Sequence, residues 1–164
     1  MTMTPVTIVN HVAVDIAAAP DAVWRVILDE YVDAKKFRET YTVEPLVDPG
    51  AVLGGYGMWM KKAGEVVDER VVYITERDDA SRRLSLFADY LSVAGGMQVF
   101  ATYQAHTTVV GVRYTLDCHA RLGIEAPASG SREEIAAAVA QMKAHFDTAL
   151  VRYLDGIKTR LEGA

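Results

Sequence analysis

The stretch VDIAAAPDAVWRVILDEY, residues 14–31, places a helix directly after a strand. Apolar and polar residues alternate up to Ile16, and this period of two is typical of a strand with one buried face. Pro20 stands where its missing N–H costs nothing, at the first position of a helix, and Asp21 suits the positive end of the helix dipole. Apolar residues then recur at helical spacing as far as Tyr31. The stretch therefore predicts a strand, a short connection and a helix.

Upstream of this stretch the alternation continues, so the first strand begins well before Val14. One face carries Ile8, Asn10, Val12, Val14 and Ile16, and the other carries Thr7, His11 and Asp15.

Downstream, residues 32–40 (VDAKKFRET) are predicted to form a second short helix. About six strand-like segments follow, separated by turn signals such as Pro49-Gly50. Strands joined by short turns pair as antiparallel neighbours. The predicted strands lie within residues 41–48, 53–62, 66–76, 83–91, 97–109 and 111–122.

The C-terminal segment predicts one long helix. Ser131 and Glu134 have the spacing of a capping box. Roughly thirty residues at 1.5 Å each give about 45 Å of helix, which must lie across the whole sheet. Its apolar stripe consists of Ile135, Val139, Met142, Phe146, Leu150, Tyr153, Ile157 and Leu161.

Length and charge restrict the classes of protein. The 164 residues suit a single domain, residues 1–164, and no apolar run is long enough for membrane insertion. A net charge of −5 without a basic stripe argues against a nucleic-acid partner. The N-terminus lacks a signal-peptide pattern, and Cys118 is the single cysteine, so a cytoplasmic location is expected. The sequence leaves a homodimer open.

This order of elements resembles the helix-grip fold of the START and Bet v 1-like (SRPBCC) superfamily. Residues 14–29 resemble the opening of its bacterial polyketide cyclase/dehydrase-like members, and residues 69–87 (ERVVYITERDDASRRLSLF) resemble their glutamate-bearing fourth strand, acidic turn and next strand. The resemblance implies an α+β fold with a curved antiparallel sheet of about seven strands wrapped around the C-terminal helix. It also implies that the first strand pairs with the last, that two short helices follow the first strand, and that a cavity separates sheet and helix.

Small residues at expected inward positions support such a cavity, because a packed core would use larger aliphatic side chains there. These inward positions are Gly57, Ala88, Ala101 and Ala105. The same alternation places Phe87 and Phe100 on the outer face. The expected ligand-binding residues are Trp59, Glu69, Tyr73, Leu86, Tyr90, Tyr103, Tyr114, Met142 and Phe146.

Glu69 is the main polar candidate of this set. It shares its strand phase with Val71 and Tyr73, and the resemblance also places a glutamate inward here. A buried carboxylate is costly unless it is paired or protonated. We therefore expect either a ligand-binding or acid–base group, with Tyr103 as a second catalytic candidate, or a structural pair with a cation such as Lys61. Trp59 is expected either to pack in the core or to stack on a ligand.

Other reactive residue types show no site pattern. His11, His106 and His119 fall on outward phases, and His145 has no assigned face. The histidines, the cysteine and the carboxylates lack ligand spacing, so no metal site is expected. The segment GGYG, residues 54–57, opens a strand and lacks the lysine–serine pair of a phosphate loop. No nucleophile motif and no cofactor motif is present.

Three functions follow from these observations. The first is binding of a small hydrophobic or aromatic molecule in the internal cavity. The second is a cyclase, dehydratase or lyase that acts in that cavity. The third is a protein-interaction module of the co-chaperone type, which would act through its outer face and show a filled core.

Overall fold

A computed structural model describes residues 2–126 and 129–163. The elements are β1 (Met3–Ile16), α1 (Pro20–Tyr31), β2 (Thr42–Pro45), β3 (Gly55–Lys62), β4 (Glu65–Asp78), β5 (Arg83–Tyr90), β6 (Met97–Thr108), β7 (Gly111–Glu125) and α2 (Arg132–Glu162). Pro20 begins α1 as predicted, with Asp21 in the first turn.

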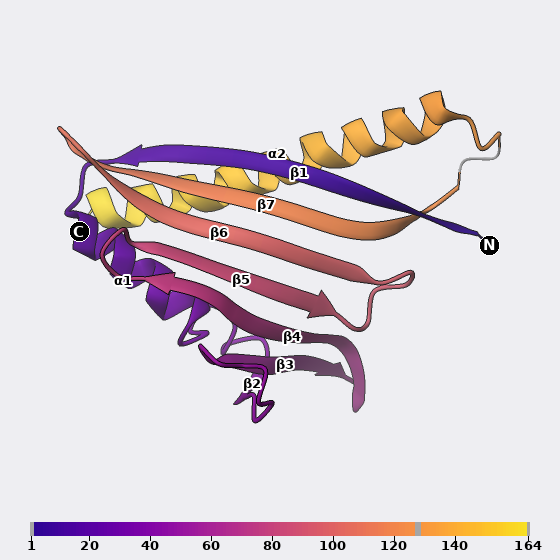
Figure 1. The fold of residues 1–164 in the computed structure, drawn as a ribbon, viewed down its shortest axis with the longest axis horizontal. Coiled ribbons are helices and arrows are strands. Elements are labelled where there is room, and N and C mark those ends of the chain that lie inside the picture. Colours follow the sequence, from indigo (N-terminus) through magenta and orange to yellow (C-terminus); the bar gives the residue numbers. More distant parts are fainter. Residues whose placement is uncertain (1, 127–128, 164) are drawn as a thin grey trace.

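The seven strands form one antiparallel sheet in the order β1-β7-β6-β5-β4-β3-β2. The first strand therefore pairs with the last one, from Met3 opposite Glu125 to Ile16 opposite Val112, as expected. Figure 1 shows the curved sheet with α2 behind β1 and β7, and α1 behind the lower strands. The helix α2 packs on β1, and α1 packs on β6 and β7. The predicted α+β helix-grip architecture is confirmed.

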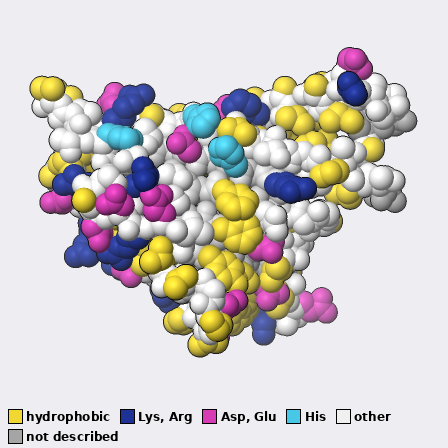
Figure 2. Space-filling view, viewed as in Figure 1, with side chains coloured by type: hydrophobic (Ala, Val, Ile, Leu, Met, Phe, Trp, Pro, Cys, Tyr) yellow, Lys and Arg dark blue, Asp and Glu magenta, His cyan; other side chains and the backbone are white. Residues whose placement is uncertain are grey.

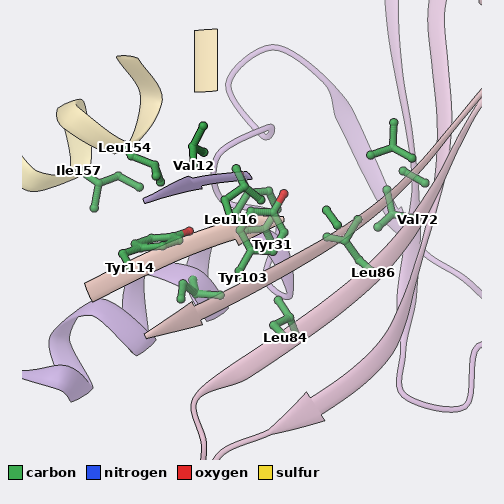
Figure 3. Packing of buried hydrophobic residues seen from close by; sticks show 14 of the residues in the cluster. Val12, Tyr31, Val72, Leu84, Leu86, Tyr103, Tyr114, Leu116, Leu154 and Ile157 are labelled. Carbon is green, nitrogen blue, oxygen red and sulfur yellow. The ribbon is translucent and has the colours of Figure 1, made fainter. Parts of the chain in front are cut away.

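The predicted faces of β1, β5, β6 and β7 are confirmed. Their inward residues form a core with the buried face of α1 and the end of α2. Figure 3 shows Tyr31, Tyr103 and Leu116 packed together near the middle of this core, and Leu154 and Ile157 of α2 on the side of Tyr114. The outward expectation for Phe100 is also correct, because this side chain is 53% exposed.

The predicted second short helix is wrong. Residues 32–40 form successive turns, in which the Phe37 N–H donates to the Ala34 carbonyl and the Thr40 N–H to the Phe37 carbonyl. Ala34 has φ 54°, a left-handed conformation that a continuing helix excludes. We call residues 32–41 the turn segment. It brings Lys36 and Phe37 to the inner side of the sheet.

The predicted inward and outward faces of β3 and β4 are also wrong: the two faces are exchanged. Opposite residues of paired strands share a face, and Val72 of β4 lies opposite Ala88 of β5, which points inward. Val72 is therefore buried, and Tyr73 lies on the outer face. Residues 66–76 carry valines on both phases, so alternation alone could not choose the face. In β3 the buried residues are Tyr56 and Met58, which leaves Gly57 on the outer side.

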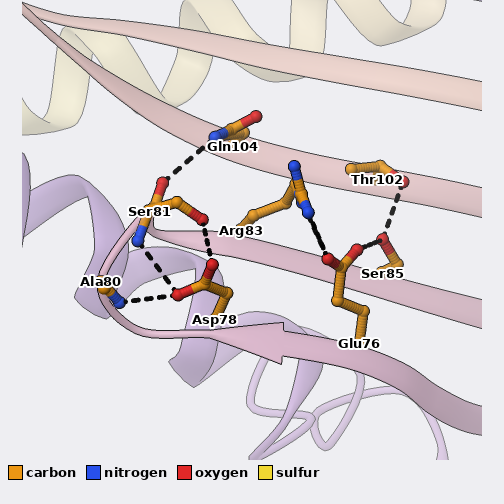
Figure 4. Close-up of polar contacts among 8 residues, drawn as sticks. All are labelled: Glu76, Asp78, Ala80, Ser81, Arg83, Ser85, Thr102 and Gln104. Carbon is orange, nitrogen blue, oxygen red and sulfur yellow. Dashed lines mark hydrogen bonds and ion pairs between the residues drawn. The ribbon is translucent and has the colours of Figure 1, made fainter.

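The outer face of the sheet combines an aromatic stripe with polar contacts. The ring centroids of Phe87 and Phe100 are 4.9 Å apart, and those of Tyr73 and Phe87 are 6.3 Å apart. Figure 2 shows hydrophobic side chains gathered over the middle and lower strands of this face. Beside the stripe, Glu76 accepts hydrogen bonds from Arg83 and from the Ser85 hydroxyl (Figure 4).

The long helix α2 docks mainly through its C-terminal part, where Leu154 and Ile157 are buried. The Ser131 hydroxyl accepts from the Glu134 N–H at 3.1 Å, so Ser131 is the N-cap, but the Ser131 N–H donates to the Ser129 hydroxyl at 3.2 Å and not to Glu134, so only one half of the predicted capping box forms. Phe146 and Leu150 are only partly buried. The middle of α2 therefore stands off the sheet and leaves room beneath it.

Candidate functional site

The space beneath the middle of α2 is a cavity of about 380 Å³. Its walls come from α2, the end of α1, the turn segment and the inner faces of β1, β4, β5, β6 and β7. The lining residues are Asn10, Tyr31, Lys36, Phe37, Arg70, Tyr90, Met97, Val99, Ala101, Tyr103, Leu116, Cys118, Ala120, Phe146, Ala149, Leu150 and Tyr153. This size is within the roughly 300–1,000 Å³ of small-molecule sites.

Three of the expected ligand-binding residues line the cavity: Tyr90, Tyr103 and Phe146. Ala101 also lines it, as its small size suggested. Leu86 and Tyr114 point inward but are packed in the core, and Met142 is partly buried against that core. None of these three is among the lining residues.

Three other expected residues lie on the opposite side of the sheet. Glu69 is exposed and faces Trp59 across the β3–β4 pair. The Tyr73 hydroxyl donates to Asp48 at 3.0 Å, outside the cavity. The inward orientation expected for these three residues is wrong, because the pairing of β4 with β5 turns their phase outward.

Tyrosines form the end of the cavity beside the turn segment. Tyr31 and Tyr103 stack with their ring centroids 4.1 Å apart, and Tyr153 meets Tyr31 edge-on at 6.5 Å. Burial raises the pKa of Tyr31, Tyr103 and Tyr153 well above the usual value, because the phenolate would lose its hydration. These phenols stay protonated at neutral pH. The Tyr153 hydroxyl donates to Glu30 of α1.

Lys36 projects from the turn segment toward these rings. Its ammonium donates to the Tyr31 hydroxyl at 2.9 Å and lies 3.8 Å from the centre of the Tyr153 ring. Burial of the ammonium lowers the pKa of Lys36 to about 8; the positive charge of Arg70 lowers it further, and the negative charge of Glu30 opposes the shift. Lys36 also borders an open hollow lined by Glu30 and Arg160, so it lies between the cavity and the outside.

Arg70 enters the cavity from β4, at the inward position next to Glu69. Its Nε and Nη2 donate to the Asp68 carboxylate at 3.1 and 2.6 Å, and Nη2 also donates to the Tyr41 hydroxyl at 2.9 Å. The guanidinium stacks on Tyr90, with its central carbon 4.3 Å from the ring centre. The hydrogen bond from Arg70 lowers the pKa of the Asp68 carboxyl, so this pair stays ionised.

Asn10 is the one polar residue among the fully buried side chains of β1, with an exposed fraction of 0%. Its Nδ2 donates to the Lys143 carbonyl at 3.1 Å and to the Asp147 carboxylate at 2.7 Å. Both partners are acceptors, so the amide orientation is fixed. The amide ties β1 to the middle of α2 at the edge of the cavity.

The sequence reasoning missed Lys36 and Arg70. The alternating register of β5 carried the signal for Arg70, since Tyr90 points inward and lies opposite Arg70. Lys36 had no comparable signal, because residues 32–40 were assigned to a helix and their turns are not periodic. Within residues 2–126 and 129–163, no group of three or more His, Cys, Asp and Glu side chains could hold a metal ion.

No family model matches the sequence, and no curated protein matches it. Solved structures do match. Norcoclaurine synthase from Thalictrum flavum, in complex with dopamine and hydroxybenzaldehyde, is 16% identical with a TM-score of 0.53, and the match covers 72% of this chain and 71% of that one. Ara h 8.0201 is 12% identical with a TM-score of 0.54, covering 93% and 99%. An uncharacterised protein of Rhizobium leguminosarum is 9% identical with a TM-score of 0.55, covering 91% and 99%.

At these identities the likeness establishes the fold. The chain has a helix-grip fold, which it shares with norcoclaurine synthase and Ara h 8.0201. No helix within the described parts of the chain has the length and apolar character needed to cross a membrane.

Proposed function

We propose that the protein binds a small hydrophobic or aromatic molecule in the cavity beneath α2. The observation that carries this proposal is a space of about 380 Å³, lined mostly by apolar and aromatic side chains, with few polar groups. Such a lining is typical of ligand sites, where apolar contact supplies affinity and a few polar groups fix orientation. The complex of norcoclaurine synthase supports the proposal, since a protein of this fold holds two aromatic molecules.

A catalytic role has less support. Glu69, the expected proton-transfer group, is exposed on the other side of the sheet. Tyr103 does line the cavity, but the raised pKa of its phenol makes it a hydrogen-bond donor and a poor base at neutral pH. We therefore propose binding without assigning a reaction.

The test is to fill the cavity from α2. Ala149 is exposed on this helix and lines the cavity, so Ala149→Phe adds a ring without overpacking a core. Ala140 is exposed on the same helix and is not among the lining residues, so Ala140→Phe is the matched control. The probe is N-phenyl-1-naphthylamine, a neutral dye whose fluorescence rises in apolar surroundings.

The proposal predicts that Ala149→Phe weakens binding of the dye on the order of tenfold, the effect of about 1.4 kcal/mol, while Ala140→Phe does not. Ala101→Phe, from the floor of the cavity, should act like Ala149→Phe. Equal affinity in the wild type and both cavity variants would reject the cavity as the binding site.

A further inference from the structure

The charged groups of the cavity wall are all of one sign. Lys36 and Arg70 are cationic, and none of the described lining residues is a carboxylate. The rest of the lining is aromatic, aliphatic or uncharged. The two cations come from different elements, the turn segment and β4, and both are in contact with tyrosine rings of the cavity.

Lys36 has no carboxylate partner among the described residues. Its ammonium is directed at the Tyr31 hydroxyl and at three rings, those of Tyr31, Phe37 and Tyr153. The nearby carboxylate of Glu30 is engaged by the Tyr153 hydroxyl and by Arg160. An ammonium has three donors, and the hydrogen bond to Tyr31 uses one of them.

Arg70 is fixed in place but not saturated. Asp68 and Tyr41 engage its Nε and Nη2, which holds the guanidinium plane against Tyr90. Nη1 makes only a long contact of 3.4 Å to the Tyr90 hydroxyl. A guanidinium carries five donors, so Arg70 keeps donors on Nη1 for a further acceptor.

We propose that the ligand carries an anionic group, a carboxylate or similar oxyanion, which Lys36 binds with the help of the Nη1 side of Arg70. This inference rests on the proposed binding function and names the chemical class of the ligand. Arg70 is already paired with Asp68, whereas the ammonium of Lys36 lies among aromatic rings without a carboxylate partner in the described residues, and a partly buried charge of this kind is stabilised when an anion joins it. The spare donors of both side chains are the charge-assisted hydrogen bonds that an oxyanion accepts.

The apolar body of the ligand lies along the remaining walls. Val99, Ala101 and Ala120 form the sheet side, and Phe146 and Leu150 of α2 form the opposite side. The ligand class is therefore an amphipathic aromatic or aliphatic acid, with its acid group toward the turn segment and its body beneath α2.

The test uses two dyes with the same aromatic body. 1-Anilinonaphthalene-8-sulfonate carries a sulfonate, and N-phenyl-1-naphthylamine lacks it. The proposal predicts that the wild type binds the sulfonate dye more tightly than the neutral one. Lys36→Met should weaken binding of the sulfonate dye by about tenfold or more, the usual scale of a charge-assisted hydrogen bond, and change the neutral dye less than about twofold.

Lys35→Met is the matched control. Lys35 is adjacent in sequence, pairs with Asp29 at 3.0 Å and is not among the cavity-lining residues. The Lys35→Met variant loses the same charge as Lys36→Met, but from outside the cavity. It should therefore leave both affinities unchanged. If Lys35→Met lowers the affinity for the sulfonate dye as much as Lys36→Met does, the effect comes from the net charge of the protein and the proposal is wrong.

The outcomes distinguish a failure of the anion site from a failure of the proposed cavity binding. If the neutral dye binds in the cavity and Lys36→Met affects both dyes equally, or neither, the anion site is rejected and cavity binding stands. If Ala149→Phe weakens neither dye, the cavity does not bind ligands and both proposals fall. Should Lys36→Met lower the melting temperature, Lys36→Gln, which keeps a polar end, replaces it with the same expected loss for the sulfonate dye.

Discussion

The Lys36 ammonium donates a 2.9 Å hydrogen bond to the Tyr31 hydroxyl at the tyrosine-lined end of the cavity. This contact joins the turn segment to the last residue of α1 and holds a positive charge among aromatic rings. Because water is partly excluded there, the pKa of Lys36 falls to about 8. The charge of the cavity therefore changes within an accessible pH range.

Binding of an anionic dye should depend on this titration. Below about pH 8 Lys36 is cationic and the affinity for the sulfonate dye is at its full value. As pH rises through the pKa of the free protein, the ammonium loses its proton and the affinity falls, by up to about tenfold per pH unit. Dye titrations from pH 6.5 to 9.5 measure this loss.

The other charged and titratable groups around Lys36 are Glu30 and Tyr31 of α1, Arg70 of β4, Tyr103 of β6, and Tyr153 and Arg160 of α2. Burial raises the pKa of the phenols of Tyr31, Tyr103 and Tyr153, so these three stay protonated over this range. Lys36→Met should abolish the pH dependence, and the neutral dye should show none. An unchanged pH profile in Lys36→Met would assign the titration to another group.

Two positions in α2 should differ in their contribution to stability. Leu154 is 1% exposed, so Leu154→Ala should lower the free energy of unfolding by about 2–5 kcal/mol. Phe146 is only partly buried and borders the cavity, so Phe146→Ala should cost about 1–2 kcal/mol, below the roughly 3–5 kcal/mol of a core phenylalanine. Denaturant unfolding measures both. A larger loss at Phe146 than at Leu154 would mean that the middle of α2 packs closely on the sheet.

The amide of Asn10 should stabilise the docking of α2. Its hydrogen bonds to Asp147 and to the Lys143 carbonyl join β1 to the helix in a buried setting. Asn10→Ala should cost about 1–3 kcal/mol of unfolding free energy. Thr7→Ala, on the exposed face of the same strand, is the control and should change little. Equal, small effects at both positions would show that this contact adds no stability.

Glu69 should have no part in ligand binding. Its side chain is exposed on the face of the sheet opposite the cavity. Glu69→Gln should therefore leave the affinities for both dyes and the melting temperature unchanged. A tenfold loss for either dye would show that β4 adopts the other face when ligand binds.

The strands with clean alternation were predictable from the sequence. In β7 polar and apolar residues alternate strictly from Val112 to Arg121, and in β6 only Phe100 interrupts the polar outward set, so one register buries the apolar residues, and the inward positions predicted for Tyr103 and Tyr114 are correct. In β4 both phases carry valine, and the face depends on which residues of β5 lie opposite. The face of β4 is therefore set by its register with β5, and the sequence of β4 alone does not contain that register.

The turn segment limited the prediction of the site. Residues 32–40 include good helix formers, but Ala34 adopts a left-handed conformation and the chain continues in turns. Lys36 reaches the cavity because of that geometry. The small size of Ala101 predicted the location of the cavity. The charge of the cavity comes from Lys36 and Arg70, which only the folded arrangement brings together.

The most direct measurement is a crystal structure of the protein with N-phenyl-1-naphthylamine bound. The account predicts density for the dye beneath α2, in contact with Ala101, Phe146 and Tyr103 and enclosed by the turn segment. Density for the dye on the outer aromatic stripe of Tyr73, Phe87 and Phe100, with the space beneath α2 filled by side chains, would contradict it.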